Sequence, residues 1–370
     1  MITFDRVTKT YPDGTVAVDD LSLEIPEGAL TVFVGPSGCG KTTSMRMINR
    51  MIDPTSGTLT VNGENIAGVD PVKLRLGIGY VIQSAGLMPH LRVVDNVATV
   101  PVLRGESRRS ARKSALQVME RVGLDPKLAD RYPAQLSGGQ QQRVGVARAL
   151  AADPPILLMD EPFSAVDPVV REELQTEILR LHNELRKTIV FVTHDIDEAI
   201  KLGEKVAVFG RGGVLQQYDA PSRLLSNPAN DAVAGFVGAD RGYRGLQFYR
   251  AAGLPLHDIR SVGEAEIDAL VLDPDDWVLV TRPDGTPYAW IDAQGVALHR
   301  SGSSLYDSTI AGGSLFRPDG TLRQAMDAAL SSPSGLGVAV DAAGRVIGGV
   351  RADDVLDAMD TQRTARQAEG

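Results

Sequence analysis

Apolar and polar residues follow two different periods along the first two hundred positions of the chain. Five short stretches have the alternation or the continuous apolar run typical of β-strands, namely 2–7, 21–25, 30–34, 156–160 and 188–193. Four longer stretches place apolar residues on one helical face, namely 41–51, 106–122, 138–152 and 168–186. Strands that alternate with helices predict an α/β fold with a mostly parallel sheet.

The last third of the chain repeats a helix–strand–strand pattern. The clearer copy consists of a helix, two strands and a second helix, at 322–330, 337–340, 346–350 and 353–359. A weaker copy of this order lies at 264–295 and begins with a predicted helix at 264–270. Two imperfect copies predict an internal repeat of about 55–60 residues. The predicted boundaries are 1–235 for the α/β domain, 236–254 for a glycine-rich linker, and 255–300 and 313–360 for the two repeats.

Composition and charge agree with this division. The 370 residues suit two or three domains, and contents of 43% apolar and 23% charged residues exclude a disordered or coiled-coil chain. The net charge of −9 is unevenly spread, because residues 240–370 contain 12 Arg, no Lys and 19 Asp plus Glu. No segment forms the basic face that general nucleic-acid binding requires, so we expect no nucleic-acid partner.

Cysteine content and hydropathy indicate where the chain works. Cys39 is the only cysteine and cannot form an internal disulfide, which suits a reducing compartment. The N-terminus lacks the pattern of a secretory signal peptide, and no apolar run approaches the roughly 20 residues of a membrane helix. We therefore expect a cytosolic chain, and any membrane crossing would belong to another polypeptide.

A glycine-rich loop follows the predicted strand 30–34 and fits the pattern G-x-x-x-x-G-K-[ST]. Its glycines let backbone N–H groups surround phosphate oxygens, Lys41 is suited to the β- and γ-phosphates, and the Thr42 hydroxyl is suited to Mg²⁺. A simple strand-to-helix turn is the alternative. The predicted nucleotide-binding residues of this loop are Gly35, Pro36, Ser37, Gly38, Cys39, Gly40, Lys41, Thr42 and Thr43.

Two further motifs carry candidate chemistry. Asp160 and Glu161 end the buried strand 156–160, and ligand sites of open α/β sheets lie at this edge. Asp160 is suited to holding Mg²⁺, and Glu161 to polarising the water that attacks the γ-phosphate. Ser137 begins a helix as an N-cap before two glycines, which indicates either a plain capped helix or a second phosphate-binding helix end.

The order and spacing of these motifs resemble the nucleotide-binding subunit of ATP-binding-cassette (ABC) transporters over about residues 1–235. The matching sequences are the phosphate loop, LSGGQ at 136–140 and ILLMDE at 156–161. The resemblance implies a P-loop ATPase core with a helical subdomain. It also implies a head-to-tail dimer in which the signature loop of one subunit covers the ATP of the other.

The resemblance assigns roles to further residues of this sequence. Gln83 fits the glutamine loop, Asp167 the D-loop and His194 the switch histidine, and Tyr11 stands where such subunits stack a ring on adenine. The implied catalytic residues are Glu161, His194, Gln83 and Lys41. The implied Mg²⁺ ligands are Thr42, Gln83 and Asp160. The implied ATP contacts outside the phosphate loop are Tyr11, Ser137, Gly138, Gly139, Gln140 and Asp167.

Two stretches, 45–57 and 78–83, resemble the ATPases of glycine betaine, carnitine, choline and proline importers. The C-terminal pair resembles tandem cystathionine-β-synthase-type (CBS) domains, with a degenerate first copy, which makes that region an α+β regulatory domain. The resemblance implies a peripheral ATPase at the cytoplasmic face of the membrane. Its partners would be permease subunits and, indirectly, an extracytoplasmic solute-binding protein. Residues 86–97 would line the permease groove or form a local core.

Several alternatives stay open at this level. One alternative is a soluble ABC ATPase of DNA repair or translation, although the chain lacks the long coiled-coil insertion or second cassette of such proteins. It would alternatively serve a sugar, polyamine or amino-acid importer. The CBS-like pair would respond to ionic strength or a cyclic dinucleotide, or would only stabilise a dimer. Alkylation of Cys39 is a further hypothetical block to ATP binding.

Overall fold

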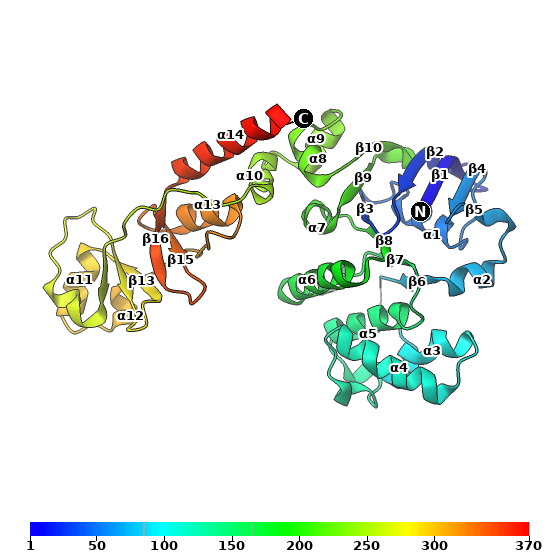
Figure 1. Ribbon diagram of the computed structural model, residues 1–370, viewed down its shortest axis with the longest axis horizontal. Helices are drawn as coiled ribbons and strands as arrows, with labels where there is room; N and C mark the ends of the chain where they lie inside the picture. The colour runs from blue at the N-terminus through cyan, green and yellow to red at the C-terminus, as the bar shows by residue number, and fades with distance from the viewer. Residues whose placement is uncertain (84–85, 165, 370) are drawn as a thin grey trace. The chain divides into compact units, whose positions relative to one another are not determined.

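The computed structural model describes residues 1–83, 86–164 and 166–369, of which 365–369 as backbone only (Figure 1). The chain divides into two compact units between Ala239 and Asp240. Each unit is described by itself. Within the described residues, none of the helices combines the length and the apolar character that a membrane span needs.

A six-stranded sheet forms the centre of the first unit, with the strand order β10-β9-β3-β8-β7-β6. All neighbours are parallel except the edge strand β10. The middle strands β3, β7 and β8 are buried at every residue, because side chains cover both faces of a parallel sheet. The strands are β3 (Leu30–Val34), β6 (Ile78–Val81), β7 (Ile156–Asp160), β8 (Thr188–Val192), β9 (Lys205–Phe209) and β10 (Leu215–Asp219).

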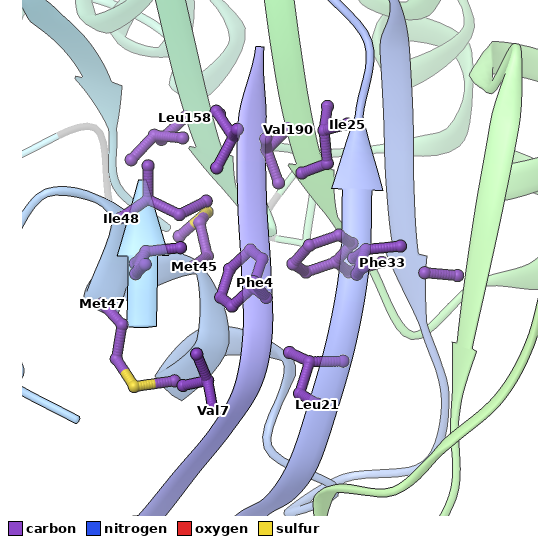
Figure 2. Packing of buried hydrophobic residues seen from close by; sticks show 14 of the residues in the cluster. Phe4, Val7, Leu21, Ile25, Phe33, Met45, Met47, Ile48, Leu158 and Val190 are labelled. Carbon is purple, nitrogen blue, oxygen red and sulfur yellow. The ribbon is translucent and has the colours of Figure 1, made fainter. Parts of the chain in front are cut away.

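A second, antiparallel sheet with the order β2-β1-β4-β5 covers the first helix of the chain. Its strands are β1 (Ile2–Thr10), β2 (Val16–Ile25), β4 (Ser56–Val61) and β5 (Glu64–Asn65). Figure 2 shows Phe4 of this sheet and Met45 of helix α1 (Lys41–Ile48) in one apolar cluster with Phe33 and Val190 of the parallel sheet. Helix α1 is therefore fixed between two sheets. Each fully buried side chain of this kind contributes about 1.5–3 kcal/mol.

The start of α1 is as predicted from the sequence, but its end is not. The pattern predicts a helix at 41–51, whereas α1 ends at Ile48. Arg50 adopts a left-handed φ of 51°, and the Met51 N–H donates to the Arg46 carbonyl, so the chain leaves the helix axis there. Apolar spacing alone did not reveal this C-terminal turn.

Helices α3 (Val93–Leu103), α4 (Arg108–Arg121) and α5 (Gly138–Leu150) pack on one another as a helical layer. Helix α3 was not predicted, because its valine-rich sequence contains Pro101 and does not separate an apolar face from a polar one. The fully buried Asn96 side chain fixes the preceding loop through the N–H of Met88, 2.8 Å away, and two loop carbonyls. The remaining helices of this unit are α2 (Pro71–Leu76), α6 (Pro168–Leu185), α7 (Ile196–Leu202), α8 (Pro221–Ser226) and α9 (Asp231–Val237).

The second unit contains two copies of one strand–strand–helix arrangement. β12 begins at residue 278 and β15 at 337, β13 begins at 287 and β16 at 346, so both strands recur after 59 residues. The first copy comprises β11 (Ser261–Gly263), β12 (Val278–Thr281), β13 (Pro287–Ile291) and α11 (Ala293–Arg300). The second comprises α13 (Leu322–Ser331), β15 (Gly337–Val340), β16 (Val346–Val350) and α14 (Ala352–Glu369). The other elements are α10 (Arg241–Gly245), α12 (Leu305–Ser308) and β14 (Ile310–Ala311).

Each copy completes the sheet of the other through the segment that precedes it. His257, before the first copy, pairs with Gly349 of β16, and β14, before the second copy, pairs with β13. The two sheets also share an apolar cluster that includes Leu279, Trp290 and Val338. This exchange makes the two copies one folding unit.

Two expectations for this region need correction. Part of the predicted linker 236–254 is core, because Leu246, Ala251 and Leu254 pack with the second copy. The glycines around these residues concealed their apolar spacing. The helix predicted at 264–270 is a 3₁₀ helix, Glu264–Ala269, in which the Glu266 carboxylate accepts the Gly263 N–H.

Trp290 carries a testable prediction about this unit. Its side chain is 1% exposed and joins the two sheets, so Trp290→Ala should lower the free energy of unfolding by about 3–5 kcal/mol. Guanidinium denaturation followed by tryptophan fluorescence measures this, since both tryptophans of the chain lie in the second unit. The half-buried Trp277 provides the control, and Trp277→Ala should destabilise less. A loss below about 1 kcal/mol for Trp290→Ala would contradict the packing described.

Candidate functional site

The glycine-rich loop lies between β3 and α1 and passes close to two other strands. Gly40 precedes α1 with a left-handed φ of 87°, and a Cβ there would overlap the Ala17 carbonyl oxygen of β2. A Cβ on Gly35 would overlap the Phe209 carbonyl oxygen of β9. Both ends of the loop therefore require glycine. The tip at Pro36, Ser37 and Gly38 is exposed, whereas Thr43 is half-buried.

Lys41 is buried within this loop. Its side-chain Nζ donates to the carbonyl oxygens of Gly35 at 2.7 Å and Pro36 at 2.9 Å, and the residue is 5% exposed. The buried Cys39 sulfur lies 3.6 Å from the same Nζ. The ammonium group is thus held at the centre of the loop, where its charge faces any anion that the backbone N–H groups bind.

Asp160, at the end of β7, is the buried carboxylate beside the loop. The Thr42 hydroxyl donates to one of its oxygens at 2.8 Å, and Arg46 Nη2 and the Tyr80 hydroxyl each lie 3.3 Å from the other. Burial raises the pKa of Tyr80, and the hydrogen bond to Tyr80 raises the pKa of Arg46. Both groups therefore keep their protons at neutral pH. The hydroxyl of Thr42 and the carboxylate of Asp160 are the hard oxygen donors that Mg²⁺ prefers.

Sequence reasoning did not identify Arg46 or Tyr80 as part of the site. Arg46 lies four residues after Thr42, so both side chains share one face of α1, and that spacing is the available signal. Tyr80 has no such signal, because only the pairing of β6 with β7 brings it beside Asp160.

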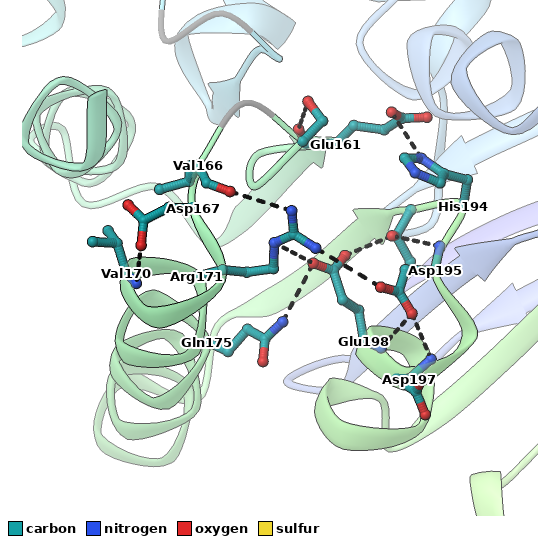
Figure 3. A network of polar contacts seen from close by, with 12 residues as sticks. Glu161, Val166, Asp167, Val170, Arg171, Gln175, His194, Asp195, Asp197 and Glu198 are labelled. Carbon is teal, nitrogen blue, oxygen red and sulfur yellow. Dashed lines mark hydrogen bonds and ion pairs between the residues drawn. The ribbon is translucent and has the colours of Figure 1, made fainter. Parts of the chain in front are cut away.

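Glu161 and His194 meet at the carboxyl edge of the parallel sheet (Figure 3). The Glu161 N–H donates to the Val192 carbonyl at 3.0 Å, and Glu161 has a left-handed φ of 44°, a conformation that costs a non-glycine residue about 1–3 kcal/mol. Its Oε2 lies 3.1 Å from His194 Nδ1. The carboxylate is half-buried and the imidazole is exposed, so both groups are accessible from solvent.

Gln83 lies at the same edge of the sheet. It is exposed and follows by two residues the end of β6, where Val81 pairs with Met159 of β7, the strand that leads into Glu161. The next two residues, Ser84 and Ala85, lie outside the described part of the chain.

Tyr11 directly follows β1, in the turn of the β1–β2 hairpin. Its backbone N–H donates to the Thr15 carbonyl at 2.9 Å, and Lys9 Nζ lies 5.5 Å from the centroid of its half-buried ring. Because Ala17 of the same hairpin borders Gly40, this tip is next to the phosphate loop.

The signature segment, which is the LSGGQ sequence at 136–140, lies in the helical layer of the unit. Ser137 caps α5 through the Gln140 N–H at 3.3 Å, and the Gln140 side chain accepts the Ser137 N–H at 3.1 Å. Gly138 is exposed, and Gly139 is buried so closely against Val170 of α6 that a Cβ would not fit without a shift. The helix that it begins, α5, packs with α6, which has Asp167 as its N-cap, and lies apart from α1 (Figure 1).

Comparison with known proteins agrees with this geometry. Residues 18–164 match the family described as ABC transporter. The carnitine transport ATP-binding protein OpuCA of Listeria monocytogenes is 52% identical over 241 residues, which are 65% of this chain and 60% of that protein. The chain thus spans less than two thirds of the length of OpuCA.

Two further proteins extend the comparison. The dimeric, ADP- and Pi-bound structure of the ATP-binding cassette MJ0796 is 35% identical, with a TM-score of 0.55, and the match covers 60% of this chain and 99% of that chain. The glycine betaine uptake system ATP-binding protein YehX of Escherichia coli K12 is 47% identical over 273 residues, 74% of this chain and 88% of that protein. With the phosphate loop, Asp160 and Glu161 inside the matched region, the chain belongs to the ABC transporter family of ATP-binding proteins.

Proposed function

We propose that this chain is the ATP-hydrolysing subunit of an ABC importer that takes up an osmoprotectant of the glycine betaine, choline, carnitine or proline type. The observation that carries the ATPase assignment is the Glu161–His194 pair, which follows β7 and β8 at the sheet edge where β3, the neighbour of β8, leads into the loop around Lys41. The names of OpuCA and YehX support the substrate class. A sugar, polyamine or amino-acid importer, or a soluble non-transport ATPase, has no comparable support among these relatives.

ATP would bind with its phosphates on the N–H groups of the loop and with Lys41 at the β- and γ-phosphates. Tyr11, at the hairpin tip, would stack on the adenine. Thr42 and Asp160, with Gln83, would hold Mg²⁺, which supplies charge neutralisation at the phosphate oxygens when bound. Arg46 would orient the Asp160 carboxylate for this task, since its guanidinium lies 3.3 Å from that carboxylate.

Glu161 would accept a hydrogen bond from the attacking water and so polarise it. His194 would orient the Glu161 carboxylate and stabilise the negative charge that develops on the phosphate. The separation of the signature segment from α1 supports a head-to-tail dimer. In that dimer, the signature segment of one subunit would complete the ATP site of the other. Its contacting residues would be Ser137, Gly138, Gly139 and Gln140, together with the nearby Asp167.

A groove in the first unit supports docking of a permease at the cytoplasmic face of the membrane. The groove has a volume of about 310 Å³ and lies between α2, β6, α3 and the end of α5. Val100 and Leu103 line it, whereas Val93 and Val97 of the expected segment 86–97 are buried in the helical layer. A short apolar helix of a permease subunit fits such a groove. The extracytoplasmic solute-binding protein would act through that permease.

The second unit would be a tandem CBS-type regulatory domain. Its 59-residue repeat and exchanged strands support this, and a cavity of about 650 Å³ beside β12 supports a small-molecule input such as a cyclic dinucleotide. The Arg282 guanidinium lies 5.3 Å from the Tyr288 ring centroid at this cavity. This side of the cavity therefore offers a positive charge and an aromatic ring to a ligand that is both aromatic and anionic. Ionic strength as the input and a purely dimer-stabilising role are the alternatives.

Glu161→Gln tests the hydrolytic role. Removal of the carboxylate charge should lower ATP turnover at least 100-fold and leave ATP binding intact, because Lys41 and the loop are unchanged. Phosphate release measures the turnover, and binding of a fluorescent ATP analogue measures the affinity. The exposed Glu184 provides the matched control, Glu184→Gln. Wild-type turnover in Glu161→Gln would remove Glu161 from its assigned role.

Leu103→Asp tests the permease groove. Leu103 is 69% exposed, so a carboxylate there should spare the core but prevent docking of an apolar helix. Copurification with the permease and uptake of labelled glycine betaine should both fall at least ten-fold in membrane vesicles. Leu116→Asp, on the neighbouring helix α4, is the control. Unchanged uptake would exclude the groove as the docking site, and uptake of a sugar instead would overturn the substrate class.

The cavity beside β12 gives a third expectation. Cyclic di-AMP should raise the melting temperature of the full chain, and Arg282→Ala should abolish the shift by removing the positive wall of the cavity. Arg317→Ala, a change at an exposed arginine of the same unit, is the control. Absence of a shift in the wild type, together with uptake that depends on salt, would favour ionic strength as the input.

A further inference from the structure

A buried carboxylate joins the loop of His194 to helix α6. Glu198, in the first turns of α7, is 7% exposed and contacts residues from two other segments (Figure 3). Its Oε2 accepts the Thr193 hydroxyl at 2.6 Å, and its Oε1 accepts the Gln175 amide of α6 at 3.3 Å. Removing a carboxylate from water in this way is costly unless hydrogen bonds and opposite charges compensate the lost hydration.

The Thr193 hydroxyl fixes the backbone on both sides of His194. It donates to Glu198 and accepts the Asp195 N–H at 3.0 Å, while the Thr193 N–H donates to the Phe33 carbonyl of β3. The conformation of the switch loop, 193–195, is therefore defined by a hydroxyl that Glu198 orients. This conformation sets the direction from which the His194 ring reaches Glu161.

Arg171 connects the same carboxylate to the D-loop. Its Nη2 donates to the Val166 carbonyl at 3.2 Å, directly before Asp167. Its Nε lies 3.9 Å from Glu198 Oε1 and its Nη1 lies 4.0 Å from Asp195 Oδ2, distances that correspond to ion pairs. One guanidinium thus contacts the D-loop, the switch loop and the buried carboxylate.

These groups surround a polar cavity that reaches the catalytic pair. The cavity has a volume of about 40 Å³, and Glu161, His194, Arg171 and Glu198 all line it. The pKa of Glu198 is raised, mainly by burial and also by the negative charge of Asp195, although the hydrogen bond from Thr193 and the charge of Arg171 act in the opposite direction. The cluster is thus a connected polar structure beside the site and not an isolated surface ion pair.

We infer that Glu198 is a positioning residue that, together with Arg171, ties the switch loop to the D-loop and so sets the alignment of His194 with Glu161. This inference rests on the proposed ATPase function. A movement of the D-loop, which lies next to the signature segment, reaches His194 through Val166, Arg171 and Glu198. The alignment of the catalytic pair is then coupled to the conformation of the D-loop.

Steady-state kinetics of the full chain test this inference. Glu198→Gln keeps the size of the side chain and removes its charge, and it should lower kcat for ATP hydrolysis at least ten-fold while KM changes less than two-fold. Thr193→Val, which removes the orienting hydroxyl, should do the same. Thr193→Ser restores that hydroxyl and should retain at least half of the wild-type kcat.

Glu172→Gln is the matched control. Glu172 of α6 forms an exposed ion pair with Lys201 of α7 at 3.6 Å, so it joins the same two helices without touching the switch loop. This variant should keep wild-type kinetics. A ten-fold loss of kcat in Glu172→Gln would mean that any link between the helices has this effect, and it would overturn the specific role of Glu198.

Crystal structures of the variants give a readout that does not depend on turnover. In Glu198→Gln and Thr193→Val, the distance from His194 Nδ1 to Glu161 Oε2 should exceed the 3.1 Å of the wild type by more than 1 Å. An unchanged distance, or a kcat within two-fold of the wild type in both variants, would overturn the inference. An inactive wild type would instead refute the proposed function, and the distance alone would then decide on Glu198.

Discussion

The site depends on the parallel pairing of three strands, β3, β7 and β8. Their side chains are buried on both faces, so apolar packing above and below the sheet holds the three strands in place. Because the strands run in the same direction, the residues that follow them gather at one edge of the sheet. The phosphate loop, Asp160, Glu161 and His194 come from three distant parts of the chain and meet there for this reason.

Burial then decides the electrostatic roles of the carboxylates at this edge. Asp160 and Glu198 are both buried, and each lies near an arginine from an adjacent helix, Arg46 and Arg171. Glu161 is less buried and faces the exposed His194. The two buried carboxylates are thus held in fixed hydrogen-bond networks, whereas Glu161 is placed where a water and a nucleotide phosphate have access.

The stability of the second unit depends on a different constraint, namely the small size of each repeat copy. A single copy of its repeat is too small to bury a sufficient core, and the exchange of strands between the copies joins two small cores through the Trp290 cluster. The same exchange connects any ligand in the cavity beside β12 to the second copy, because β13 pairs with a segment that leads into that copy. The regulatory role proposed for this unit fits the architecture, because the two copies share strand pairing and an apolar cluster.

Sequence patterns alone predict the parallel α/β core, the phosphate loop and the repeat, and they single out Lys41, Asp160, Glu161 and His194 as candidate site residues. These follow from local signals, namely apolar runs that end in polar residues and glycines at fixed spacing. The contacts of Tyr80 with Asp160 and of Arg171 with Glu198 are visible in the fold alone, because strand pairing and helix packing bring these residues together from distant parts of the chain. Helix α3 and the core residues within 246–254 were also missed, since their local composition resembles that of a strand or a linker and only packing assigns them.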